Sequence, residues 1–186
     1  PIGSVVIDDM HACISCIQEQ FSITVPRTNV LYNLIANLFY DDMNAQAEGR
    51  FNEIVNSQNT FDNMMVPFWS WQEKITQVYQ ILASNRENDA VKFKFDLIKD
   101  CLKLSHCYIS AKEISIIPNC TPIQKITSFD EAKRRIYMSA TLPDDSPFST
   151  VMGLDFDKKM TVISPEKAND IGERLIVVPK IINKDI

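Results

Sequence analysis

The fold is decided by the stretch Gly3-Ser4-Val5-Val6-Ile7-Asp8-Asp9-Met10-His11, where an apolar run meets two adjacent acids. The β-branched residues of this run predict a buried strand, and a helical pattern begins at Met10. In open α/β sheets, ligands bind outside the carboxyl ends of the strands. Asp8 and Asp9 would therefore stand where Mg²⁺ can be held and a water polarised. The alternative is an Asp-rich turn in which Asp9 caps the following helix.

Composition restricts the classes of protein. The chain has 186 residues and is 45% hydrophobic, enough for one domain or one domain with an insertion. Its net charge of -5 is spread along the chain, so nucleic-acid binding would need a local basic patch. No apolar segment has the length of a membrane span, and the N-terminus is not a signal peptide. We expect a cytoplasmic protein, and a strand so close to Pro1 predicts a piece of a longer chain.

The five cysteines include one C-x-x-C pair, Cys13 and Cys16. An odd count without a secretory signal favours reduced thiols. Cys13 shares its helical spacing with apolar neighbours, and no second close pair completes a zinc site. We therefore favour buried structural thiols over metal or redox chemistry. The remaining cysteines are Cys101, Cys107 and Cys120.

The middle of the chain, from about residue 28 to 105, has helical periodicity. We predict helices over residues 28–39, capped by Thr28 or Asn29, over 45–55, after Pro67, and over about 93–104. Together they predict a bundle of four or so helices. Polar residues 41–44 and 56–63 predict a break and a loop. The helix after Pro67 has a buried stripe at a 3.6-residue period, namely Trp71, Ile75, Val78, Tyr79 and Leu82.

Strand signals return after His106. Residues 107–110 and 114–117 predict a hairpin, and Ser128 with Glu131 predicts a capping box before a short helix. Lys133, Arg134 and Arg135 would end that helix. A short buried strand, Ile136-Tyr137-Met138, then runs into Ser139-Ala140-Thr141-Leu142. Further strands are expected at 161–164 and 175–178, with a helix or loop over 147–154.

Two of these motifs together resemble a known family. Asp8-Asp9-Met10-His11 resembles motif II of DEAD/DEAH-box proteins, and Ser139-Ala140-Thr141 resembles helicase motif III. The pair resembles superfamily-two helicases, which are ATP-driven motors with two RecA-like lobes. Asp9 and Ser139 stand 130 positions apart. A large helical insertion at this place resembles the Arch domain of xeroderma pigmentosum D-type helicases.

The resemblance implies an α/β fold: a partial RecA-like (P-loop NTPase) parallel sheet with a large inserted α-helical bundle. Residues 1–26 would carry the motif II strand and helix, 27–106 the insertion, and 107–186 the rest of the lobe. Asp8 would order Mg²⁺ on ATP, and Asp9 would replace the glutamate that polarises the attacking water. Because Asp is one methylene shorter than Glu, the attacking water would have to sit closer or a second group would have to help position it.

The resemblance also gives roles to the remaining motif residues. His11 would link the nucleotide site to motif III, and Ser139-Ala140-Thr141 would couple hydrolysis to movement. None of the four glycines is followed by Lys, so the chain has no P-loop. We predict that this piece alone neither binds ATP tightly nor unwinds nucleic acid. The family's iron-sulphur cysteines precede motif II, so the sequence does not decide whether a cluster exists.

Two groups of residues are candidates for contacting nucleic acid, which the resemblance implies is single-stranded DNA. Phe68 and Trp69 fit the buried stripe poorly and would stack on bases, although packing within the protein is the favoured alternative. The run Lys133-Arg134-Arg135 is a local basic patch, which helix-end solvation explains equally well. The leading hypothesis is a central fragment of an ATP-dependent DNA helicase or translocase. The alternative is a degenerate, non-catalytic scaffold for protein contacts.

Overall fold

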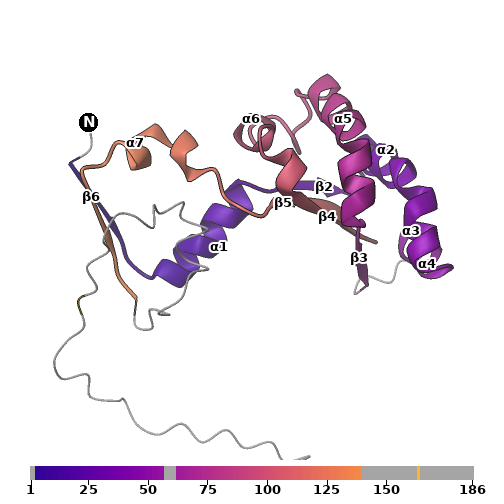
Figure 1. The fold of residues 1–186 in the computed structure, drawn as a ribbon, viewed down its shortest axis with the longest axis horizontal. Helices are drawn as coiled ribbons and strands as arrows, with labels where there is room; N and C mark the ends of the chain where they lie inside the picture. The colour runs from indigo at the N-terminus through magenta and orange to yellow at the C-terminus, as the bar shows by residue number, and fades with distance from the viewer. Residues whose placement is uncertain (1–2, 57–61, 140–162, 164–186) are drawn as a thin grey trace, which may run out of the picture. The chain divides into compact units, whose positions relative to one another are not determined.

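The computed structural model describes residues 3–56, 62–139 and 163 (Figure 1). The chain divides into two compact units, residues 1–156 and 157–186, and all described helices and strands belong to the first. In these described residues no helix has both the length and the apolar character needed to cross a membrane. The elements predicted at 147–154 and 175–178 lie outside the described residues, as does the strand at 161–164 apart from Ile163.

A small parallel sheet joins two segments that are far apart in the sequence. Strand β1 (Ser4–Ile7) pairs with β6 (Arg134–Tyr137), and Val6 lies opposite Ile136. Helix α1 (Met10–Gln20) follows β1, while η2 (Ile123–Lys125) and α7 (Thr127–Asp130) precede β6. A small apolar core forms around Met10, Ile123 and Phe129, with inward residues of both strands packed against it.

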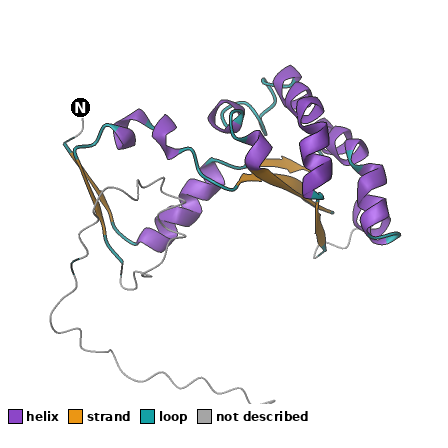
Figure 2. Cartoon of the chain, in the orientation of Figure 1, coloured by secondary structure: helices purple, strands orange, loops and turns teal. Residues whose placement is uncertain are grey.

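The second sheet has four antiparallel strands in the order β2-β5-β4-β3. Figure 2 draws the strands in orange and the helices in purple. These are β2 (Ile23–Pro26), β3 (Asn63–Met65), β4 (Ser105–Ser110) and β5 (Glu113–Pro118). β4 and β5 form the predicted hairpin, which is thus confirmed. Alternate residues of β2, β4 and β5 are buried, as expected for an antiparallel sheet with one covered face.

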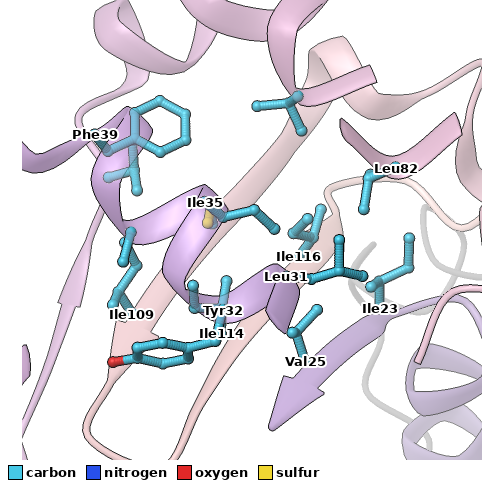
Figure 3. Packing of buried hydrophobic residues seen from close by; sticks show 14 of the residues in the cluster. Ile23, Val25, Leu31, Tyr32, Ile35, Phe39, Leu82, Ile109, Ile114 and Ile116 are labelled. Carbon is cyan, nitrogen blue, oxygen red and sulfur yellow. The ribbon is translucent and has the colours of Figure 1, made fainter. Parts of the chain in front are cut away.

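The helices of the middle segment contribute to one core with this sheet. They are α2 (Val30–Leu38), α3 (Tyr40–Gln46), α4 (Arg50–Asn56), α5 (Phe68–Ser84), α6 (Phe95–Ile98) and the 3₁₀ helix η1 (Leu102–Leu104). Figure 3 shows Leu31 and Ile35 of α2 among Val25, Ile114 and Ile116 of the strands. Burial of these side chains is the main force that stabilises this part of the chain.

The mixed α/β class is confirmed, but the middle segment is not a helical bundle alone. Its helices pack on an antiparallel sheet that takes strands from all three of the predicted segments. Sheet pairing between β2 and β5 joins residues that are about 90 positions apart in the chain, which local periodicity does not report. The boundaries after residues 26 and 106 stay predictions.

Several local predictions are wrong for physical reasons. The polar break at 41–44 lies inside α3, where Asp41 and Asp42 occupy the favourable first turn and Met43 is buried. The helix expected over 93–104 is reduced to α6 and η1. α7 begins at Thr127 with no side-chain cap, so the capping box at Ser128 does not form.

Candidate functional site

The parallel pairing of β1 and β6 brings the two predicted motifs to the same end of one sheet. The Met138 amide donates to the carbonyl of Ile7 at 2.8 Å, and the Met10 amide donates to the carbonyl of Met138 at 3.1 Å. The ladder therefore continues past both strands as far as the first residue of α1. Asp8 and Asp9 leave β1 beside the point where Ser139 leaves β6.

Asp8 presents an exposed carboxylate at this end of the sheet. Its Oδ1 accepts the amide of Asp9 at 3.0 Å, a local bond that holds the side chain over the turn. Its backbone carbonyl accepts from the Cys13 thiol, whose Sγ lies 3.4 Å away. Asp8 is thus fixed by short-range contacts at the start of the turn, with its carboxylate facing solvent.

Asp9 has a left-handed backbone, with φ 49° and ψ 69°. Asp is one of the few residues that tolerate this region, and such conformations cluster at functional sites. Its Oδ1 accepts the amide of Ala12 at 3.4 Å, so Asp9 is the N-cap of α1. The capping geometry weighed as the alternative is therefore present. The same carboxylate that would polarise a water also satisfies a helix amide.

The other motif residues are placed only in part. His11 is the second residue of α1, and its side chain is not among those described. Ser139 is half-buried at the end of the strand. Ala140 and Thr141 lie outside the described residues.

Asp8 and Asp9 at the end of β1 are residues that could contribute ligands to a magnesium ion. Mg²⁺ in phosphate-transfer sites keeps several waters and takes one or two carboxylates plus phosphate oxygens. Asp8 and Asp9 supply carboxylates at a solvent-accessible sheet end. Within the described ranges, no group of three or more His, Cys, Asp or Glu side chains is arranged to hold a metal by itself. Phosphate oxygens would therefore have to complete the ion's shell.

The aromatic start of α5 separates into a buried and an exposed part. Trp71 is 1% exposed, stacks on Phe39 at a ring separation of 5.8 Å, and donates its indole N–H to the carbonyl of Leu102 at 2.8 Å. Phe68 and Trp69 are 49% and 58% exposed. Neither side chain is buried among the described residues, and both base stacking and the packing alternative stay predictions.

The buried stripe of α5 is likewise only partly as predicted. Val78 and Leu82 are buried, and Ile75 is half-buried. Tyr79 is instead 44% exposed and leans on the ring of Phe95, with centroids 5.3 Å apart. A tyrosine at the margin of a stripe can keep its hydroxyl in water while its ring is partly covered.

The basic run is divided in the same way. Arg135 packs over the ring of Phe129 at 4.6 Å and donates to the carbonyls of Phe129 and Asp130 at 3.0 and 2.7 Å. Lys133 and Arg134 are exposed. The run does not end a helix as predicted, because α7 stops at Asp130 and Arg134 already belongs to β6. Arg135 therefore contacts α7, and Lys133 and Arg134 are the exposed basic residues of this run.

The cysteines differ from the expectation of buried thiols. Cys107 is buried, and burial raises the pKa of its thiol. Cys13 and Cys101 are half-buried, while Cys16 and Cys120 are exposed. The contact of the Cys13 thiol with the carbonyl of Asp8, five positions earlier, was missed from the sequence.

Comparisons with known proteins identify no relative. No family model matches the chain, and no curated protein or solved structure matches it.

Proposed function

We propose that this chain is part of an ATP-dependent helicase or translocase. In this proposal, β1, β6 and α1 belong to the first RecA-like lobe. The antiparallel sheet and its helices form a body inserted between motifs II and III. The proposed substrate is nucleic acid, in particular single-stranded DNA, along which the protein would move.

The proposal rests chiefly on the parallel pairing of β1 with β6. Two motifs that are weak singly follow adjacent strands of one sheet and leave at the same end. Parallel strands require a crossover connection, and ligands of such sheets bind outside the carboxyl ends. A chance pair of motifs separated by more than a hundred residues has no reason to meet in this way.

A second observation supports a larger sheet. Val6 and Ile136 lie opposite each other in the register and are 58% and 48% exposed. Met138, two residues further along, is also exposed. Parallel sheets are nearly always covered on both faces, and a two-stranded sheet is marginal by itself. An apolar face on two parallel strands is therefore consistent with a sheet that continues in a longer protein.

Each acid has a distinct role in the proposed hydrolysis. ATP with Mg²⁺ would supply the bond to be broken and the charge that neutralises the leaving phosphate. Asp8 would bind the ion, because its carboxylate faces solvent at the sheet end. Asp9 would orient a water through the oxygen that does not cap α1. A P-loop would have to come from elsewhere in the protein, because no glycine here is followed by Lys.

The exposed aromatic pair and the exposed basic pair are the proposed nucleic-acid contacts. Stacking on Phe68 and Trp69 would contribute about 1–3 kcal/mol per base. Lys133 and Arg134 would contact phosphates, and their contribution would fall as salt rises.

The alternative is a non-catalytic scaffold, and the geometry of Asp9 favours it. A carboxylate occupied in capping a helix is less available for positioning a water, and Asp is shorter than the usual Glu. In the scaffold hypothesis, the same exposed aromatic residues bind a protein partner instead of bases.

ATP hydrolysis by the full-length protein that carries this sequence separates the two hypotheses. The motor hypothesis predicts turnover stimulated by single-stranded DNA and abolished by Asp8→Ala and by Asp9→Asn. Asp89→Asn is a matched control, because Asp89 is an exposed acid in the loop after α5. The absence of stimulated turnover in the unaltered protein would exclude the motor and leave the scaffold.

A further inference from the structure

The C-x-x-C pair on α1 is a feature that the proposed function does not use. Cys13 and Cys16 are three positions apart on the same helix, and Cys16 is exposed. Neither residue belongs to a metal-binding group within the described residues. Two thiols on one helix face, one of them open to solvent, form a candidate site for thiol chemistry.

Cys13 donates hydrogen bonds to the backbone carbonyls of both acids that precede the helix. Its thiol donates to the carbonyl of Asp8, with Sγ and O 3.4 Å apart. Its amide donates to the carbonyl of Asp9 at 3.1 Å. Any change at Cys13 therefore acts directly on the turn that carries both carboxylates.

Helix geometry allows the two cysteines to be joined, with some strain. Residues three apart on an α-helix have Cα atoms about 5 Å apart, within the range of disulfides. Their Cβ atoms are roughly 5–6 Å apart, whereas a disulfide needs about 3.5–4.5 Å. Formation of a disulfide between Cys13 and Cys16 must therefore distort the first turns of α1. A strained and accessible disulfide is easily reduced, which is typical of labile and regulatory bonds.

We propose that Cys13 and Cys16 form a reversible disulfide that alters the Asp8–Asp9 turn. A disulfide oxidant such as oxidised glutathione is the co-reactant. The Cys16 thiolate attacks one glutathione sulfur, which forms a mixed disulfide and releases one glutathione thiolate. The Cys13 thiolate then attacks the Cys16 sulfur and releases the second glutathione. The cysteine pair loses two electrons and two protons, and the glutathione pair gains them.

Oxidation removes a hydrogen bond at the site. The Cys13 sulfur no longer carries a proton, so it can no longer donate to the carbonyl of Asp8. The distorted first turn also strains the bond from the Cys13 amide to Asp9, which already has a left-handed backbone. The modification itself is independent of ATP chemistry. Only its effect on hydrolysis rests on the proposed function.

Mass mapping of the oxidised protein tests the disulfide. The protein is treated with oxidised glutathione, its free thiols are alkylated, and it is digested with trypsin. Trypsin cleaves after Lys and Arg, and Arg27 is the first of these in the sequence, so the segment that ends there contains Cys13 and Cys16 and no other cysteine of this chain. We expect this segment to lose both free thiols as an internal disulfide, and dithiothreitol to restore them. In Cys13→Ser, which cannot resolve the intermediate, glutathione should stay attached to Cys16.

Three results would overturn the proposal. In the first, both cysteines stay alkylatable after oxidation. In the second, wild-type Cys16 keeps its glutathione while Cys13 stays free. In the third, the disulfide forms but amide hydrogen exchange of Cys13 is unchanged, which would remove the link to the Asp8–Asp9 turn. Cys120→Ser is the matched control, because Cys120 is also exposed but lies far along the chain, and its replacement should alter none of these results.

Discussion

The two tryptophans of α5 allow a sharp test of how the antiparallel sheet and its helices are held together. Trp71 and Trp69 are two positions apart on one helix, but the first is buried and the second is largely exposed. We compare Trp71→Phe with Trp69→Phe, so that the chemical change is the same at both positions.

The expected magnitude for Trp71→Phe follows from two losses. The carbonyl of Leu102 loses its partner in a buried position, which costs about 1–3 kcal/mol. The smaller ring also buries roughly 40 Å² less apolar surface, or about 1 kcal/mol at 25 cal/mol per Å². We therefore expect a total loss of about 2–4 kcal/mol. Trp69 is 58% exposed, so Trp69→Phe should stay within about 0.5 kcal/mol of wild type.

Urea unfolding followed by far-ultraviolet circular dichroism measures both variants. With an m-value of about 2 kcal/mol per M, a loss of 3 kcal/mol lowers the midpoint by about 1.5 M. Because the chain has two tryptophans, each variant retains one, and fluorescence reports its environment. Trp71 alone should emit at shorter wavelength than Trp69 alone. Equal midpoints for the two variants, or the larger loss for Trp69→Phe, would refute the burial argument.

Three further predictions concern the core and its surroundings. Asn29→Ala removes the cap of α2 and the two hydrogen bonds that the side chains of Asn29 and Asn88 exchange. It should therefore lower the free energy of unfolding by about 1–2 kcal/mol. Thr28→Ala is the control and should have little effect in the same urea titration. Hydrogen bonds from Lys74 and then Ser70 hold the pKa of Asp42 below its usual 3.8. The ionised Asp42 carboxylate therefore stabilises the folded state above the usual pKa of 3.8, and this stabilisation is lost as the pH falls through the lowered pKa of the folded protein. Wild type should exceed Asp42→Asn by about 1–2 kcal/mol at neutral pH, and unfolding curves at lower pH should show that difference shrinking below about pH 4. Cys107 is buried and the pKa of its thiol is raised, so it should be protected from a maleimide in the folded protein. The exposed Cys120 should react at once, and peptide mapping of the labelled protein checks both residues.

Short-range patterns predicted much of the fold. Alternating apolar residues gave the hairpin of β4 and β5, and the 3.6-residue period placed Trp71, Val78 and Leu82 in the core. The cap of α2 was predicted at Thr28 or Asn29, and the structure has it at Asn29, whose side chain accepts the Leu31 amide. In each of these cases the decisive interaction lies within a few residues.

Elements that depend on distant partners were missed. β3 lies partly in a polar stretch and forms because Met64 is buried and its backbone pairs with β4, more than forty positions away. The pairing of β2 with β5 likewise depends on a partner that is distant in the sequence. No local pattern contains this information, since a strand is stabilised by neighbours that are distant in the sequence.

The candidate site was predictable in outline and not in detail. The resemblance of Asp8-Asp9-Met10-His11 and Ser139-Ala140-Thr141 to helicase motifs implied that both follow strands of one parallel sheet. The left-handed backbone of Asp9 and the thiol contact of Cys13 depend on how one turn closes. The exposure of Phe68 and Trp69 depends on which helices surround α5, which periodicity at a helix start does not determine.

The pairing of β1 with β6 can be measured directly by nuclear magnetic resonance. We predict nuclear Overhauser contacts between Val6 and Ile136, and slow exchange of the Met10 and Met138 amides that complete the ladder. If residues 4–7 show no contact with residues 134–137, or contact another strand, the acids do not lie beside Ser139 and the proposed nucleotide site is contradicted.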